Sequence, residues 1–287
     1  MTKRSILVAA IFGTALSLSP AQSPLTPDQL ICNKIFSSAF EQKLIDKPVG
    51  SVMTSVAKSF LGAPYVGGTL DSTIDEHLVI NLRGFDCVTL IENTLALVRA
   101  VKSNTLTYDA FMRQLQLIRY RRGHIDGYAS RLNYFSEWIY DNLKKGVLVD
   151  VTRELGGIPY KKEINFMSKH RNTYKKLAAD STYASIKAAE AELASTPWYY
   201  IRKSRIAGIE SRIEEGDIIA ITTSIEGLDI SHTAIAVKGK DGRMHLLHAP
   251  DTNGTVRITD ETISGHLAKH PSQTGIVVAR IKGVISR

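Results

Sequence analysis

The chain has 287 residues, of which 44% are hydrophobic and 22% charged. This composition is typical of a globular protein, and it excludes a disordered or fibrous one. The formal net charge of +8 favours an acidic partner such as nucleic acid, a membrane surface or an anionic polymer. The two cysteines, Cys32 and Cys87, are too few for a disulfide scaffold or a four-thiolate zinc site, so they allow at most one bridge.

The first residues have the pattern of a secretory signal peptide. Lys3 and Arg4 precede an apolar stretch of 13 residues at 6–18, and small residues follow up to Ala21. The alternative is a membrane anchor, but this stretch falls short of the about 20 apolar residues that a spanning helix needs. We expect cleavage after Ala21 and an exported protein, periplasmic or secreted, with a mature charge of +6 and no integral membrane segment. Export argues against nucleic acid as the partner.

In chain order, the first predicted element is a helix over residues 48–61, where apolar residues keep helical spacing until Gly62-Ala63-Pro64. Asp86 is a good N-cap for a second helix that begins at Cys87. Apolar residues cover most of the surface of this second helix, so we expect it in the core. Three further helices are predicted near residues 108–118, 132–142 and 185–194.

After residue 205 the pattern changes to short runs rich in β-branched residues, separated by Gly and Asp. Strands are predicted over residues 218–222, 233–237, 244–248 and 277–281. Helices come first and antiparallel strands last, which predicts an α+β fold. We expect residues 22–287 to form a single domain.

Cys87 is the candidate nucleophile, because the first turn of a helix stabilises a thiolate through its dipole and free N–H groups. Two other interpretations stay open: a packed core cysteine, and a disulfide partner of Cys32. A cysteine hydrolase also requires a histidine that takes the thiol proton and later protonates the leaving group.

His232 opens the predicted strand over 233–237, although a histidine at such an edge is usually a surface residue. His248 lies on the next strand, and a hairpin turn centred near Lys240 would place it opposite His232. There it could fix the tautomer of the catalytic imidazole. A turn centred on Asp241-Gly242 would instead separate the two histidines.

The other histidines do not predict a metal site. His245 and His248 are three residues apart on a strand, so they face opposite ways. His266 and His270 are spaced for one face of a helix, but they lack a nearby third ligand and we expect them on the surface. No metal and no cofactor is predicted.

Taken together, these motifs resemble the NlpC superfamily of papain-like cell-wall cysteine hydrolases. The resemblance rests on residues 57–68 (AKSFLGAPYVGG), Phe85-Asp86-Cys87, Glu215-Gly216-Asp217, Ser231-His232-Thr233-Ala234-Ile235 and Leu247-His248-Ala249. It implies that Cys87 is the nucleophile, His232 the base and His248 the third catalytic residue, and that Tyr65 helps to hold the substrate. It also implies a papain-like fold, in which N-terminal helices include a nucleophile helix packed on a C-terminal antiparallel sheet.

Two departures from the superfamily point to one branch. Val88-Thr89 follows Asp-Cys where most relatives have Ser-Gly, and 145 positions separate Cys87 from His232. With residues 120–139 (YRRGHIDGYASRLNYFSEWI), these features resemble the N-acetylmuramoyl-L-alanine amidase-like branch. Members of that branch cut between the lactyl group of muramic acid and the first L-Ala of the stem peptide. The resemblance implies peptidoglycan or muropeptide fragments as substrate, and we expect a monomer. A stem-peptide endopeptidase with the same triad and a non-catalytic wall-binding protein are the alternatives.

Residues 99–205 are predicted to form a basic, mostly helical insertion. They hold 20 Lys+Arg and 10 Asp+Glu, whereas the rest of the mature chain holds 14 and 18. We expect the insertion to wall the cleft, with Tyr128 and Arg131 in a loop that binds sugar or carboxylate. For Tyr134 and Trp138, helix packing and a place in that wall stay equally open.

Overall fold

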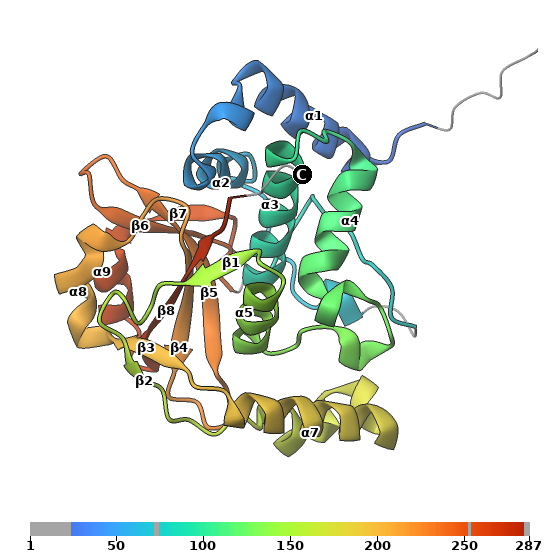
Figure 1. Ribbon diagram of the computed structural model, residues 1–287, viewed down its shortest axis with the longest axis vertical. Coiled ribbons are helices and arrows are strands. Elements are labelled where there is room, and N and C mark those ends of the chain that lie inside the picture. Colours follow the sequence, from blue (N-terminus) through green and yellow to red (C-terminus); the bar gives the residue numbers. More distant parts are fainter. Residues whose placement is uncertain (1–23, 72–74, 252–253, 284–287) are drawn as a thin grey trace, which may run out of the picture.

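The computed structural model describes residues 24–71, 75–251 and 254–283, so the predicted signal peptide over 1–21 lies outside the described residues. The described chain forms nine α-helices and eight β-strands (Figure 1). The helices are α1 (Pro27–Glu41), α2 (Val49–Lys58), α3 (Cys87–Lys102), α4 (Tyr108–Arg119), α5 (Phe135–Lys144), α6 (Phe166–Lys169), α7 (Asp180–Ser195), α8 (Ile206–Ile209) and α9 (Ile263–Ala268). The strands are β1 (Leu148–Asp150), β2 (Ile158–Pro159), β3 (Tyr199–Arg202), β4 (Ile218–Thr223), β5 (Ile230–Lys238), β6 (Met244–His248), β7 (Arg257–Thr262) and β8 (Gln273–Ile281). None of these helices is long and apolar enough to cross a membrane.

The strands form one antiparallel sheet in the order β2-β3-β8-β4-β5-β6-β7, and β1 pairs with β8 beside β3. Alternate residues of the central strands pack into two different hydrophobic cores, one on each face of the sheet, because successive side chains of a strand point to opposite faces. On β4, Ile218 and Ala220 belong to the larger core, whereas Ile219 and Ile221 belong to the smaller one. Helices α1 to α5 lie on the side of the larger core, and α8 and α9 cover the other face (Figure 1).

Helix α3 is the central helix of the larger core, with 12 of its residues buried. Its start is fixed by a capping box: the Asp86 carboxylate accepts from the Thr89 amide at 2.7 Å, and the Asp86 amide donates to Thr89 Oγ1 at 3.0 Å. These bonds satisfy groups that a helix start otherwise leaves unpaired. The prediction of a capped, buried helix beginning at Cys87 is confirmed, and Thr89 has a structural role in closing the capping box.

Helix α2 meets the loop before β4 at a close contact between two glycines. A Cβ on Gly50 would lie 2.1 Å from the carbonyl oxygen of Glu215, and a Cβ on Gly216 would lie 2.5 Å from Gly50 Cα. Gly216 also has a φ of +88°, which disfavours any residue with a side chain. The Glu-Gly-Asp motif therefore allows α2 to pack closely against the start of the central strands.

The segment over 99–205 is less helical than predicted. It contains α4 to α7, but it also supplies β1, β2 and β3, which extend the sheet beyond β8. These strands have three, two and four residues, too short to show an alternating pattern. The prediction also missed α1, although Thr26 and Gln29 form a capping box around Pro27 and this sequence signal marks its start.

Candidate active site

One pocket brings together Cys87, His232, His248 and Tyr65, four of the six predicted site residues. It lies where β6 ends and β5, β7 and β8 begin, and its volume is about 540 Å³. Further residues that line it are Asp251, Arg257, Glu261, His266, Lys269 and His270. The start of α3 and one end of the sheet thus converge on a single cavity.

Cys87 is a free, partly buried thiol in the first turn of α3. Cys32 is also free and is buried in α1, so the structure contains no bridge between them. The hydroxyl of Thr233 on β5 donates to the Cys87 carbonyl at 2.7 Å and thereby ties the helix start to the strand. Because Cys87 lines the pocket, the structure does not place it as a fully enclosed core residue.

Burial raises the pKa of the Cys87 thiol to about 11, and the neighbouring Asp86 carboxylate also raises it, although hydrogen bonds from Thr233 act in the opposite direction. The sequence predicts that the helix start stabilises a thiolate. Desolvation outweighs that effect, so the thiol is protonated at neutral pH.

The imidazoles of His232 and His248 are in direct contact. Nε2 of His232 lies 2.7 Å from Nδ1 of His248, and the two rings are at 89° to each other. This contact occupies Nε2 and leaves Nδ1 as the nitrogen of His232 that could serve Cys87. In the described structure no hydrogen bond joins the thiol to His232, and such bonds often tighten only when substrate binds.

The register of the hairpin differs from the predicted one. Ile235 pairs with Leu247, which centres the β5–β6 turn on Asp241 and not near Lys240. The two histidines are therefore diagonal neighbours and do not stand directly opposite each other. Diagonal pairs on one face of a sheet are still within reach of large side chains, which explains why the rings meet despite the shift.

Burial lowers the pKa of His232 to about 4 and the pKa of His248 to about 3. Neighbouring histidines lower both values further, whereas Asp251 raises the pKa of His232. Both rings are thus neutral at pH 7. Nε2 of His248 is buried and has no hydrogen-bond partner among the described residues.

His266 is not the surface residue that its spacing suggested. It is buried on α9, and its ring centroid lies 5.5 Å from that of His248 and 4.4 Å from that of the exposed His270. Burial, together with His270 and Arg257, lowers the pKa of His266 to about 4. The pocket thus contains four histidines in a row, although no group of three or more His, Cys, Asp or Glu in the described chain is arranged to hold a metal ion.

Tyr65 lies near Cys87 in the same pocket, as the resemblance implied. A parallel bridge to Phe85 and a hydrogen bond of 2.8 Å from its amide to the Gly254 carbonyl fix its backbone. Partial burial raises the pKa of its hydroxyl, and the nearby Cys87 and Asp251 raise it further. The Tyr65 side chain is therefore a neutral hydrogen-bonding group on the wall of the pocket.

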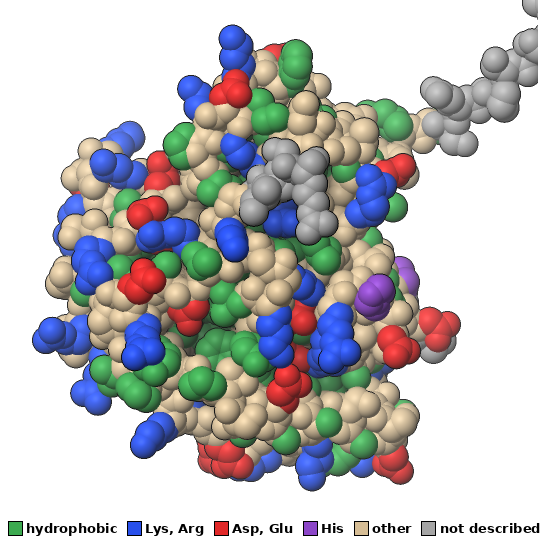
Figure 2. Space-filling model, viewed as in Figure 1, with side chains coloured by type: hydrophobic (Ala, Val, Ile, Leu, Met, Phe, Trp, Pro, Cys, Tyr) green, Lys and Arg blue, Asp and Glu red, His purple; other side chains and the backbone are tan. Residues whose placement is uncertain are grey.

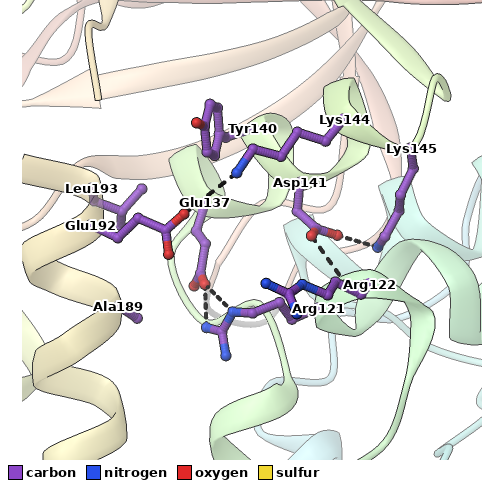
Figure 3. A pocket seen from close by; sticks show the side chains of 10 residues that line it. All are labelled: Arg121, Arg122, Glu137, Tyr140, Asp141, Lys144, Lys145, Ala189, Glu192 and Leu193. Carbon is purple, nitrogen blue, oxygen red and sulfur yellow. Dashed lines mark hydrogen bonds and ion pairs between the residues drawn. The ribbon is translucent and has the colours of Figure 1, made fainter. Parts of the chain in front are cut away.

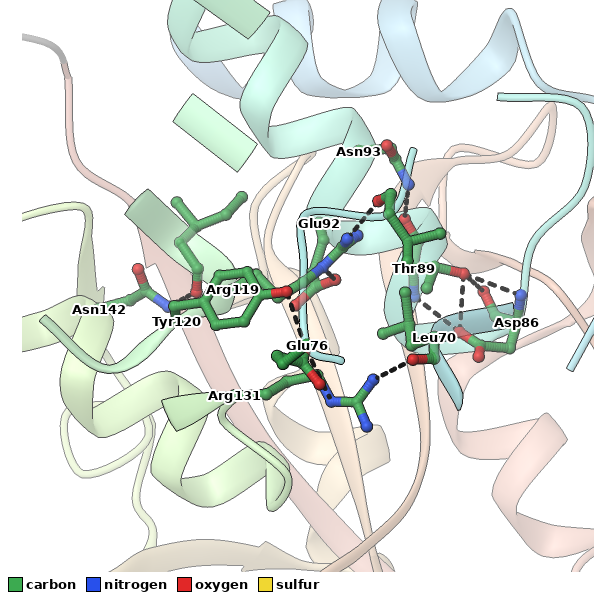
Figure 4. Close-up of polar contacts among 12 residues, drawn as sticks. Leu70, Glu76, Asp86, Thr89, Glu92, Asn93, Arg119, Tyr120, Arg131 and Asn142 are labelled. Carbon is green, nitrogen blue, oxygen red and sulfur yellow. Dashed lines mark hydrogen bonds and ion pairs between the residues drawn. The ribbon is translucent and has the colours of Figure 1, made fainter. Parts of the chain in front are cut away.

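The structure does not bring Tyr128 and Arg131 into this pocket. Both are buried, and the Arg131 guanidinium packs over the Tyr128 ring at 4.7 Å. Arg131 donates to the Leu70 carbonyl at 2.8 Å, pairs with Asp71 and lies 3.9 Å from Glu76 (Figure 4). These contacts fix the loop before α3, and both residues lie outside the pocket that contains Cys87.

The same network joins α4 to α3. Arg119 and Glu92 form a buried ion pair of 2.7 Å, and the Tyr120 hydroxyl lies 2.8 Å from the Glu76 carboxylate (Figure 4). For Tyr134 and Trp138 the packing interpretation is confirmed, because both side chains are buried in the larger core.

The basic insertion does not wall the Cys87 pocket, since none of the residues that line it falls between 99 and 205. Charges of the insertion line a different pocket of about 370 Å³ between α5 and α7 (Figure 3). Its three carboxylates are already paired: Glu137 with Arg121, Asp141 with Lys145 and Glu192 with Lys144. No cysteine, serine or histidine lines this second pocket, so its residues offer no ordinary nucleophile–base pair.

The face of the molecule seen in Figure 2 has no continuous basic patch. Lys and Arg side chains are spread over this face and interspersed with Asp and Glu. This face therefore gives no support to a duplex or a bilayer as the partner that the net charge first suggested.

Comparison with known proteins agrees with the motifs. Residues 55–276 match a family described as AmiA-like, N-acetylmuramoyl-L-alanine amidase-like. The chain is similar to an N-acetylmuramoyl-L-alanine amidase from Bacteroides uniformis, with 38% identity over 82% of this chain and 99% of that one and a TM-score of 0.77. It is also similar to a putative xylanase from Bacteroides fragilis, with 38% identity over 79% of this chain and 100% of that one and a TM-score of 0.74. A Legionella pneumophila protein shares the fold at 19% identity, over 90% of this chain and 96% of that one, with a TM-score of 0.66. No curated protein matched the sequence significantly.

Proposed function

Since the chain belongs to the N-acetylmuramoyl-L-alanine amidase-like family, we propose that it is a cysteine-dependent peptidoglycan amidase. The bond it cuts joins N-acetylmuramic acid to the first L-Ala of a muropeptide. The observation that carries this proposal is the 2.7 Å contact between His232 and His248 in the pocket that also holds Cys87. The same motifs support its membership of the NlpC superfamily of papain-like hydrolases.

The reaction begins when Nδ1 of His232 takes the proton of the Cys87 thiol and Sγ attacks the lactyl carbonyl carbon. The oxyanion that forms is held by backbone N–H groups at the start of α3. Because Asp86 already binds the Thr89 amide, we assign this role to the amides of Cys87 and Val88. The C–N bond then breaks as His232 delivers its proton to the departing L-Ala nitrogen.

The second half of the reaction removes the acyl group from the enzyme. A water molecule loses a proton to His232 and attacks the thioester carbonyl, the C–S bond breaks, and the proton returns to the Cys87 sulfur. The products are a free lactyl carboxylic acid, which ionises at neutral pH, and a stem peptide with a free L-Ala amine. The residues themselves supply each of these proton transfers.

His248 determines which nitrogen of His232 carries the proton in the resting site. If His232 Nδ1 is to accept from the thiol, its Nε2 must carry the hydrogen and donate it to His248 Nδ1. When His232 becomes an imidazolium, the same contact keeps its ring oriented between the sulfur and the leaving nitrogen. The low pKa of His248 keeps its ring neutral at neutral pH, so its Nδ1 can accept this hydrogen when its Nε2 carries the N–H.

The proposal is tested by mass spectrometry of the products from intact wall and from purified muropeptides, side by side. An amidase releases an intact stem peptide with a free L-Ala amine. A dipeptide product would instead identify a stem-peptide endopeptidase, new reducing ends would identify a glycoside hydrolase, and binding without products would identify a wall-binding protein. Retention of activity in a chelator is expected, and its loss would contradict a mechanism in which cysteine replaces a metal.

We further propose that the protein acts outside the cytoplasm as a monomer after its first 21 residues are removed. The motif over 1–21 supports this location, and so does a substrate that is part of the cell wall. N-terminal sequencing of the exported protein should begin at Gln22, and a protein that retains Met1 would contradict the proposed cleavage.

A further inference from the structure

Arg257 is an exposed cation on the wall of the Cys87 pocket, at the start of β7. It is paired across the strands with His248, so the side chains of the two residues leave the sheet on the same face. Within the described part of the chain, no carboxylate forms an ion pair with its guanidinium. An arginine in this position has five N–H donors available for a ligand.

The other charges of the pocket lie elsewhere or are already paired. Lys269 forms an ion pair with Glu261. Asp251 also lines the pocket, and its carboxylate raises the pKa of Tyr65 and of His232.

Arg257 lies on the wall of the pocket beside its strand partner His248. Its charge lowers the pKa of His248 and of His266, and these two rings are neutral at pH 7. Asp260 also lines the pocket from β7, but it is exposed and forms no ion pair with Arg257. Beside His248 and His266, the unpaired positive charge therefore comes from Arg257.

The direction of the substrate follows from the proton transfers. His232 must lie next to the leaving nitrogen to protonate it, so the departing stem peptide extends from Cys87 past His232. From the strand of His232 to the strand of Arg257 there are two strand spacings, or about 10 Å. An extended peptide covers about 7 Å in two residues, and an arginine side chain can span the remaining distance.

From this geometry we propose that Arg257 binds the α-carboxylate of the second stem residue, D-Glu, and makes the enzyme prefer stems in which that group is a free acid over those in which it is an amide. This inference rests on the proposed amidase function and adds the substrate class to it. A guanidinium recognises a carboxylate through paired N–H groups, and a carboxamide presents only one oxygen acceptor and no charge.

The test compares two muropeptides that differ only at this α-carboxyl group: N-acetylmuramoyl-L-alanyl-D-glutamate and N-acetylmuramoyl-L-alanyl-D-isoglutamine. For the wild type we expect kcat/KM to be about tenfold to a hundredfold higher for the acid than for the amide, as is typical when a hydrogen bond to a charged group is lost. Arg257→Gln should lower kcat/KM for the acid to the value for the amide while leaving the amide unaffected. Arg257→Lys should retain an intermediate preference.

Lys240→Gln is the matched control, because Lys240 is an exposed cation in the β5–β6 turn, at the opposite end of the sheet. It should keep the full preference for the acid. Two results would overturn the assignment of Arg257 without affecting the amidase function. One is an equal kcat/KM of the wild type for the two substrates, and the other is an equal fall in kcat/KM for both substrates in Arg257→Gln. If the wild type releases no peptide with a free L-Ala amine from either substrate, the amidase function itself fails and the assignment of Arg257 fails with it.

Discussion

Nε2 of His232 lies 2.7 Å from Nδ1 of His248, with the two rings nearly perpendicular. The contact joins adjacent strands diagonally, and it fixes the ring of His232 beside the start of α3. In the proposed mechanism, the neutral imidazole of His248 takes the place of the carboxylate or amide that orients the base in many hydrolases. Its consequences can be tested one residue at a time.

Replacing His248 should slow turnover without weakening substrate binding. In His248→Ala the ring of His232 loses its only hydrogen-bond partner in the described structure, and we expect kcat to fall about a hundredfold with little change in KM. His248→Asn can present an amide oxygen in place of Nδ1 and should recover part of this loss. Steady-state kinetics on a purified muropeptide measure both effects, with the exposed His124→Ala as control. Full activity in His248→Ala would refute the orienting role.

The pH dependence of kcat/KM should not show the ordinary pKa of histidine. In the proposed mechanism His232 is the base, and burial lowers its pKa to about 4, so it is still unprotonated at pH 5.5. We expect kcat/KM to change less than about twofold between pH 7.5 and 5.5, whereas an imidazole with a pKa near 6.5 would cause about a tenfold loss. An acidic limb centred near pH 6.5 would contradict the buried neutral base.

Stability should fall as the pH is lowered from about 6.5 towards 4. The pKa values of His232, His248 and His266 are lowered to about 4, 3 and 4 in the folded protein, so below pH 6.5 only the unfolded chain takes up these protons. Each histidine then contributes a slope of up to about 1.4 kcal/mol per pH unit. Urea unfolding at several pH values measures the slope.

The variant His266→Leu isolates one part of this pH dependence. It removes one of the three titrating groups and should reduce the slope of stability against pH between 6.5 and 4. The exposed His124→Leu should leave the slope unchanged. Equal slopes in the wild type and in His266→Leu would show that His266 titrates normally in the folded state.

Arg131→Ala should destabilise the protein and leave its affinity for substrate unaltered. The side chain of Glu76 is 5% exposed, and without Arg131 its charge would stay buried beside the Tyr120 hydroxyl alone. Breaking such a buried pair costs about 3 kcal/mol in the free energy of unfolding. The double variant with Glu76→Gln should regain part of this loss. A tenfold rise in KM with an unchanged unfolding curve would instead restore Arg131 to the substrate site.

Local sequence signals were sufficient to predict the elements that carry Cys87 and His232. Asp86 and Thr89 mark the start of α3 within four residues, and the β-branched runs mark β4 to β6. The hairpin register was harder to predict, because a Gly-Lys-Asp-Gly-Arg turn allows more than one centre and only packing on both faces selects among them.

The failed predictions concern contacts between residues far apart in the sequence. Arg131 resembled a binding residue in a polar loop, but its partners Asp71 and Glu76 precede it by 60 and 55 positions. His266 resembled a surface residue because β7, against which α9 packs, contains charged residues and was not predicted as a strand. Neither the long-range ion pairs nor the packing of α9 in the smaller core can be predicted from a periodic pattern in the local sequence.

The role of Cys87 is tested most directly by comparing Cys87→Ala with Cys32→Ala on a purified muropeptide, with the products identified by mass. Cys32→Ala removes the other thiol, which is buried in α1 and does not line the pocket, so the variant should release stem peptide with a free L-Ala amine as the wild type does. Cys87→Ala should lose this activity by a factor of at least about a thousand while keeping the unfolding curve of the wild type. Full amidase activity in a folded Cys87→Ala variant would contradict the account.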